Sequence, residues 1–159
     1  MEINRKRILL AAVLIIANIA LDQITKQLAQ QHLQGLGQLS YLGDFFRLSY
    51  VENKGAFLSL GAGLTGALRY IMLNILPVLL LLGLLAYTLF SPQLLRSQII
   101  AFSFILGGGI SNVFDRIVYG QVVDFMNVGL GSLRTGIFNF ADLSIMIGLG
   151  IMLPFLFKK

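Results

Sequence analysis

The stretch YIMLNILPVLLLLGLLAYTLF, residues 70–90, decides what kind of fold this chain can adopt. It carries no charged residue, and about 20 apolar residues in a helix cross the roughly 30 Å hydrocarbon core of a bilayer. Pro77 removes one backbone donor within it, so we expect a kink there. The stretch therefore predicts a membrane-spanning helix.

Composition extends this prediction to the whole chain. The 159 residues are 57% hydrophobic and 12% charged, with a mean hydropathy of +0.83, whereas a soluble domain carries about 25% charged residues. We expect an all-α polytopic membrane protein, a single membrane domain of residues 1–159. Its expected parts are four transmembrane helices at about 8–29, 70–90, 97–116 and 139–157, outer segments at about 30–69 and 117–138, and a cytoplasmic loop at about 91–96.

The first expected helix, at about residues 8–29, has a second interpretation, a cleaved signal peptide. It has a basic start at residues 5–7, an apolar centre, and ANIA as a passable cleavage site. The helical pattern continues through LDQITKQLAQ, which favours a retained helix, and an intact mass would separate the two.

Charge predicts the orientation of the four spans. Four crossings place both termini on one side, and the twelve Lys and Arg divide evenly between the two sides. The bases on the side of the termini are concentrated in short tails and one short loop, so we expect both termini to be cytoplasmic. The acids expected at the opposite, outer face are Asp22, Asp44, Glu52, Asp115, Asp124 and Asp142. This one-sided distribution indicates a functional site at the outer face of the membrane.

The two outer segments interrupt the helical pattern. In residues 40–60, FFRLSYV is aromatic and β-branched, ENKG is a turn signal and AFLSL follows, which fits a small two- or three-stranded extracytoplasmic β element or an irregular loop. Residues 61–70 could form a short interfacial helix. Four glycines in 117–139 predict a second extracytoplasmic loop that is flexible and could move over a site.

Several chemistries are excluded by composition. The chain has no cysteine, and its one histidine, His32, lies in the polar run QQHLQ without the partners of a triad or of a metal cluster. No His-Glu-x-x-His motif is present. The bases flank apolar blocks and form no stripe with aromatics, so no nucleic acid partner is expected. Carboxylates remain as the candidate catalytic groups.

Asp124 and Asp142 form the natural carboxylate pair. Two carboxylates that share one proton can hydrolyse an amide without a metal, one as general base on a water and one as general acid. Asp124 lies in a segment that could fold back, and Asp142 lies about one turn inside the last apolar stretch. The alternative is that each carboxylate caps a helix or pairs with a nearby base. For Asp115, which precedes Arg116, the two interpretations are balanced.

Two further motifs carry polar residues near helix ends. In GGGISNVFDR, residues 107–116, Asn112, Asp115 and Arg116 are spaced to share one helical face. The glycines there favour close helix packing, within the bundle or between copies, over substrate passage. ENKG, with Asn53 and Gly55, is on its own a turn.

Together these motifs resemble the bacterial lipoprotein signal peptidase (signal peptidase II) family over nearly the whole chain. The matching segments, in order, are LDQITK with Asp22, Gln23 and Lys26, NKGAF with Asn53, Gly55, Ala56 and Phe57, GGGISNVFDR with Gly107, Gly108, Asn112, Asp115 and Arg116, VVDF with Asp124 and Phe125, and FNFAD with Asn139, Ala141 and Asp142. One departure is Ser111, where the family usually has glycine, and the chain has no tryptophan.

The resemblance implies an inner-membrane aspartyl endopeptidase that cuts a prolipoprotein on the N-terminal side of its diacylglyceryl-modified cysteine. It implies that Asp124 and Asp142 are catalytic, sharing a proton and activating a water. The residues implied to line or hold the substrate site are Asn53, Gly55, Asn112, Arg116 and Asn139, with Asp22, Lys26, Asp115 and Gly108 in support. No metal or cofactor is expected, the partners are the lipidated prolipoprotein and membrane lipid, and we expect a monomer.

Two rival functions remain open at this point. A small transporter could use the acids as a cation or proton path, although no span carries acids into its cytoplasmic half. A non-catalytic membrane scaffold needs no carboxylate pair. Activity that depends on both carboxylates would distinguish a peptidase from either.

Overall fold

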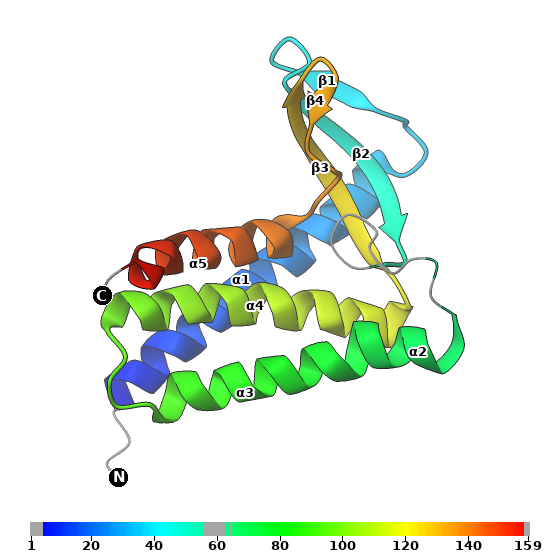
Figure 1. Ribbon diagram of the computed structural model, residues 1–159. Coiled ribbons are helices and arrows are strands. Elements are labelled where there is room, and N and C mark those ends of the chain that lie inside the picture. Colours follow the sequence, from blue (N-terminus) through cyan, green and yellow to red (C-terminus); the bar gives the residue numbers. More distant parts are fainter. Residues whose placement is uncertain (1–4, 56–62, 64, 158–159) are drawn as a thin grey trace.

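The computed structural model describes residues 5–55, 63 and 65–157, which form a helical bundle with a small sheet at one end (Figure 1). The helices are α1 (Arg5–Leu33), α2 (Gly66–Tyr70), the π-helical turn η2 (Ile71–Ile75), α3 (Leu76–Phe90), α4 (Arg96–Tyr119) and α5 (Phe140–Leu156). The start of α1 and the end of α5 lie at the same end of the bundle, and the sheet lies at the other (Figure 1).

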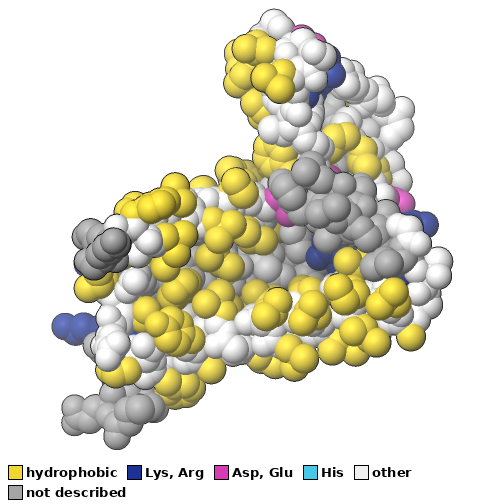
Figure 2. All heavy atoms as spheres, in the orientation of Figure 1, with side chains coloured by type: hydrophobic (Ala, Val, Ile, Leu, Met, Phe, Trp, Pro, Cys, Tyr) yellow, Lys and Arg dark blue, Asp and Glu magenta, His cyan; other side chains and the backbone are white. Residues whose placement is uncertain are grey.

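Three helical segments are long and apolar enough to cross a bilayer, namely Arg5–Leu33, Gly66–Phe90 and Arg96–Tyr119. α5 is equally apolar but has 17 residues, or about 25 Å of helix. Large apolar side chains cover the outward faces of the bundle, among them Leu79 and Leu80 on α3 (Figure 2). Apolar faces this extensive are typical of a surface in contact with lipid.

The second long segment departs from a regular α-helix where the sequence predicts a kink. Pro77 stands in the first turn of α3, and the preceding residues Ile71–Ile75 form the wider π turn. Because Pro77 has no N–H to donate to the preceding turn, the backbone can widen there at little extra cost.

The glycine run of α4 lets three helices approach α4 closely. A Cβ at Gly107 would lie 2.6 Å from Asn18 Cβ of α1, one at Gly108 would overlap the Ala141 carbonyl oxygen of α5, and one at Gly109 would meet Leu81 of α3. The three consecutive glycines therefore serve packing within the bundle.

The sheet is antiparallel, with four strands in the order β1-β2-β3-β4. Its strands are β1 (Leu39–Tyr41), β2 (Phe46–Asn53), β3 (Val122–Leu130) and β4 (Leu133–Arg134). The predicted β element at 40–60 is confirmed for its first two strands, while the stretch AFLSL lies outside the described residues.

The prediction of a flexible loop over the segment after α4 is wrong. It contains β3, which pairs with β2 over the whole length of β2, apart from a shift in register between Leu48 and Val51. Gly120 ends α4 and Gly131 lies between β3 and β4, both at positive φ. Glycine adopts that conformation without strain, so these two glycines mark a helix end and a turn.

The sheet rests on the end of α1. Ala29 and Leu33 pack with Phe125 and Met126 of β3, and apolar side chains from β1 and β2 complete the cluster. This packing fixes β3 to the bundle, so a side chain on β3 can be held against the ends of α4 and α5.

Candidate active site

Asp124 is held at the junction of the sheet and the bundle. It is 3% exposed, and both of its carboxylate oxygens accept a hydrogen bond from an amide. Asn53 Nδ2 donates to Oδ2 over 2.8 Å, and Asn139 Nδ2 donates to Oδ1 over 2.6 Å. Asn53 can reach Asp124 because it lies opposite Val122, two residues along β3, where side chains share a face.

Asp142 lies in the first turn of α5 and is half-buried. Its backbone N–H donates to Asn139 Oδ1 over 3.0 Å, and its Oδ2 accepts from Asn139 N–H over 3.2 Å, which is the reciprocal pattern of a capping box. Its Oδ1 accepts from Asn112 Nδ2 over 3.0 Å. Asp142 therefore does cap a helix, as the alternative interpretation expected, and in doing so lies beside the carboxamides of α4 and α5.

Asn139 joins the two carboxylates, since its side chain donates to Asp124 and its backbone donates to Asp142. Asn139 is fully buried, and its Nδ2 also donates to Asn112 Oδ1 over 3.2 Å. Among the described residues, neither Asp124 nor Asp142 has an ion pair with a lysine or arginine. The pair is thus bound by neutral donors and can still exchange a proton.

Burial changes the acidity of Asp124. Removal of its carboxylate from water raises its pKa from 3.8 to about 6, and the nearby negative charge of Asp142 acts in the same direction, against the amide donors Asn53 and Asn139. A carboxyl group with a pKa near neutrality can hold a proton and release it, as a general acid must.

A second polar cluster lies directly beside the pair. Lys26 Nζ contacts Asp22 Oδ2 and Asp115 Oδ2, each at 2.6 Å, and donates to Asn112 Oδ1 over 2.8 Å. All four side chains are buried. Asp115 thus pairs with Lys26 of α1 and not with its neighbour Arg116.

The second cluster positions the start of α5. Asp22 Oδ1 accepts from the backbone N–H of Ala141 over 2.8 Å, one residue before Asp142. Lys26 holds Asn112, which in turn donates to Asp142. Two connections therefore run from α1 to the first turn of α5, one to its backbone and one to the Asp142 carboxylate.

Arg116 connects the end of α4 to the segment after β2. Its Nε donates to the Gly55 carbonyl over 3.1 Å, and Gly55 N–H donates to Asn53 Oδ1 over 2.8 Å. These contacts turn ENKG toward the carboxylate pair, although the sequence alone indicated only a turn.

The structure brings together every site residue that the sequence indicated within its described part. Of the six predicted outer acids, Asp44 lies away from this site, whereas Glu52 lines a pocket with Lys26 and Asp115 of the second cluster. Asp44 pairs with Arg47 at the sheet, and Glu52 accepts from the Tyr50 hydroxyl. Ala56 and Phe57, named from the resemblance, lie outside the described residues.

Two contributors were named from the sequence without a role in the site. Ser111, noted only as a departure, donates to Asp22 Oδ2 over 2.7 Å, and Gln23, named only as a matching residue, donates through Nε2 to Ser111 Oγ and Asp115 Oδ1. The spacing of Ser111 and Asp115, one helical turn apart, was the available signal.

A metal is not implied by the side chains gathered here. Across the described ranges 5–55, 63 and 65–157, no three His, Cys, Asp or Glu residues are clustered so that they could ligate one ion. His32 lies exposed in the last turn of α1.

The family described as signal peptidase (SPase) II matches residues 14–158. Lipoprotein signal peptidases are similar over most of the chain: that of Treponema denticola is 40% identical over 94% of this chain and 91% of that protein, and that of Borrelia hermsii is 32% identical over 100% and 96%. A bacterial membrane enzyme solved by the in meso method shares the fold, with a TM-score of 0.79 at 23% identity over 94% of this chain and 93% of that one.

Proposed function

The chain belongs to the signal peptidase II family of membrane aspartic peptidases, and we propose that Asp124 and Asp142 are the carboxylates that perform its chemistry. The activity of the family is that of a lipoprotein signal peptidase. The substrate we propose is a prolipoprotein whose cysteine already carries diacylglycerol, cut on the N-terminal side of that cysteine.

The observation that carries this proposal is the double contact of Asn139. One residue donates to Asp124 through its side chain and to Asp142 through its backbone, so the two carboxylates are held at one place by elements distant in sequence. Ion-paired carboxylates would be fixed in the charged form, whereas this pair has only amide donors among the described residues.

The proposed reaction uses one proton shared by the pair. Asp124 is the more buried and has the raised pKa, which supports placing the proton there. Asp142, in the ionised form, takes a proton from a water as that water attacks the scissile carbonyl carbon, while Asp124 donates its proton to the carbonyl oxygen. Collapse of the tetrahedral intermediate then breaks the C–N bond: Asp142 gives its proton to the leaving amine, and Asp124 takes a proton back from a hydroxyl of the intermediate, which restores the starting state of the pair.

The surrounding residues have proposed roles as holders of the substrate and of the pair. Asn53, Asn112 and Asn139 donate to the carboxylates and line the site, with Gly55 and Arg116 at its edge. Asp22, Lys26 and Asp115 support them, and Gly108 allows α5 to approach α4 so that Asp142 reaches Asn112.

The proposed topology is four spans in one membrane domain, with α5 as the fourth, both termini cytoplasmic and the site at the outer face of the inner membrane. The clustering of bases near the chain ends and the common position of the start of α1 and the end of α5 support it (Figure 1). A monomer suffices, since all the residues in this mechanism come from one chain. The lipidated substrate would enter laterally from the bilayer.

The test is cleavage of a diacylglyceryl-modified prolipoprotein in detergent by the wild type, Asp124→Asn and Asp142→Asn. We expect each amide to lower kcat by a factor of about 10³ or more, because a positioned acid or base contributes about 10²–10⁴ and the two act together. Circular dichroism checks that each variant is folded.

Asp44→Asn is the matched control, since Asp44 lies on the sheet in an ion pair with Arg47. It should cut at nearly the wild-type rate. If a folded Asp124→Asn or Asp142→Asn variant cut the substrate at the wild-type rate, the assignment of these two residues as catalytic would be refuted. If the wild-type protein did not cut the lipidated prolipoprotein, the proposed substrate would be refuted.

A further inference from the structure

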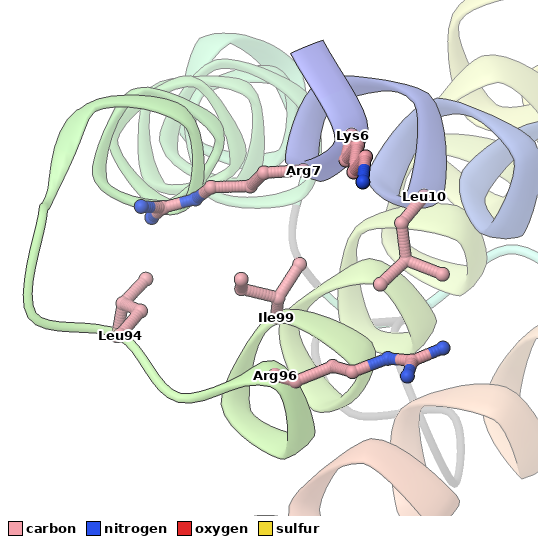
Figure 3. Close-up of a pocket in the computed structure, with 6 residues that line it drawn as sticks. All are labelled: Lys6, Arg7, Leu10, Leu94, Arg96 and Ile99. Carbon is pink, nitrogen blue, oxygen red and sulfur yellow. The ribbon is translucent and has the colours of Figure 1, made fainter. Parts of the chain in front are cut away.

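A basic cavity of about 470 Å³ lies at the end of the bundle opposite the carboxylates (Figure 3). It lies between the start of α1, the α3–α4 loop and the start of α4. Its lining residues are Lys6, Arg7, Leu10, Leu94, Arg96 and Ile99. A volume of this size is within the range of small-molecule sites, about 300–1,000 Å³.

Three of the six lining side chains are cations and none is an acid. The carboxylates of the described residues begin at Asp22, about 25 Å further along α1 from Arg5, and continue toward the sheet. Among the described residues, the carboxylates therefore lie away from the cavity.

Arg7 gives the cavity a fixed wall. Its Nε donates to the Thr88 carbonyl over 2.7 Å, and its Nη1 donates to the Ser91 carbonyl. These carbonyls are at the C-terminal end of α3, where the helix dipole favours a cation. Arg7 therefore attaches α1 to the loop after α3, while Lys6 and Arg96 are exposed and can reach a ligand.

The depth of the cavity matches a lipid headgroup. From Arg96 at one end of α4 to Arg116 beside the active site the helix rises about 30 Å, which is the thickness of the hydrocarbon core. Arg96 and Lys6 thus lie at the boundary of the far leaflet, and Leu10 and Ile99 continue the cavity wall toward the hydrocarbon.

We propose that this cavity binds the phosphate of one anionic phospholipid from that leaflet. Lys6 and Arg96 would contact the phosphate oxygens, Arg7 would add positive charge to the wall, and the acyl chains would lie along Leu10 and Ile99. Basic pockets between membrane helices are suited to such headgroups. The alternative, that the bases act only in setting the orientation of the chain, predicts no selective binding at this place.

The test is native mass spectrometry of the detergent-purified protein titrated with phosphatidylglycerol or with phosphatidylcholine of the same chain length. We expect a one-to-one complex with phosphatidylglycerol and a much weaker one with phosphatidylcholine. Lys6→Gln and Arg96→Gln should each weaken phosphatidylglycerol binding about fivefold, since a base near an anionic lipid contributes about 1 kcal/mol.

Arg5→Gln is the charge-matched control, because Arg5 is also exposed on the first turn of α1 but does not line the cavity. It should leave the affinity unchanged, and Lys6→Arg should restore binding. Equal weakening of phosphatidylglycerol binding by Arg5→Gln, or no preference for phosphatidylglycerol over phosphatidylcholine, would overturn the proposal.

A competition with inorganic phosphate distinguishes a lipid ligand from a free phosphate ion. Millimolar phosphate should not displace the bound lipid, and displacement would show that the cavity binds free phosphate and not a lipid. Prolipoprotein cleavage by Lys6→Gln should stay at the wild-type rate.

Discussion

Two pairs of carboxylates lie side by side in this molecule and differ in the groups that contact them directly. Asp22 and Asp115 share the ammonium group of Lys26 at 2.6 Å. Asp124 and Asp142 share the amides of Asn139 instead, and no described lysine or arginine forms an ion pair with either. The aspartates of the first pair thus contact a compensating cation, whereas those of the second pair contact neutral donors.

The difference indicates which pair can do chemistry. A carboxylate beside a buried cation is stabilised in its charged form and is poorly suited to exchange protons. A carboxylate held by amides keeps its position without being fixed in one protonation state. The cluster of Lys26 therefore supports structure, and the pair bridged by Asn139 is the one suited to acid–base work.

The largest expected effect comes from removing the cation. Lys26→Met leaves Asp22 and Asp115 buried without their counter-charge, and breaking a buried ion pair costs about 3–5 kcal/mol. We expect the free energy of unfolding to fall by that amount, measured by denaturant titration in mixed micelles with circular dichroism.

Lys54→Met is the matched control, because Lys54 is exposed and should lose little stability. Adding Asp115→Asn to Lys26→Met should recover part of the loss. An unchanged stability of Lys26→Met would show that the cation does not compensate the two acids.

The next effect in size concerns the pH dependence of Asp124. The pKa of Asp124 is about 6 in the folded protein and 3.8 in the unfolded chain. Its favourable contribution to the free energy of unfolding is therefore complete below pH 3.8, where the carboxyl is protonated, and is lost as pH rises through 6. That loss is at most about 3 kcal/mol. Asp124→Asn should therefore gain stability relative to the wild type between pH 4 and pH 8, measured as the difference in unfolding midpoint.

Asp44 provides the opposite sign in the same experiment. Its hydrogen bond with Arg47 holds the pKa of Asp44 below its usual range, so its contribution is present at neutral pH and is lost as pH falls. Asp44→Asn should therefore differ from the wild type by a nearly constant amount between pH 4 and pH 8, and that difference should shrink as pH falls below about 4. A similarly constant difference for Asp124→Asn between pH 4 and pH 8 would contradict the raised pKa.

The smallest effect concerns Ser111, which belongs to the cluster of Lys26. Ser111→Ala removes its hydrogen bonds with Asp22 and Gln23, but both partners keep another contact. We expect a loss of about 1 kcal/mol in unfolding free energy and unchanged kcat and KM. Ser103→Ala is the control, since within the described residues buried Ser103 bonds to the Ile99 carbonyl of its own helix. A large loss of activity in Ser111→Ala would show that Ser111 acts on the proposed catalytic pair as well as on stability.

The helices could be predicted from the sequence because hydrocarbon contact depends on each residue alone. Uninterrupted apolar stretches such as residues 70–90 form helices in lipid whatever the rest of the chain does, since every backbone group is bonded within the segment. The break before Pro77 and the packing role of the glycine run were likewise local consequences of residue type.

The sheet was only half predictable. β1 and β2 are adjacent in sequence and carry a local signal, whereas β3 is some 70 residues away from its partner β2. A strand gains its hydrogen bonds only from a neighbour, so glycines near its ends were mistaken for signs of a loop. The pairing that places Asp124 diagonally from Asn53 depends on that long-range contact.

The sequence by itself determined the membrane class, the one-sided distribution of acids and the two candidate carboxylates. Only the tertiary structure decided which acids are paired with a cation, that Ser111 and Gln23 belong to the supporting cluster, and that Asn139 joins Asp124 to Asp142. The physical reason is that hydropathy acts along the chain, whereas hydrogen bonds and ion pairs depend on distances of about 3 Å between residues far apart in sequence.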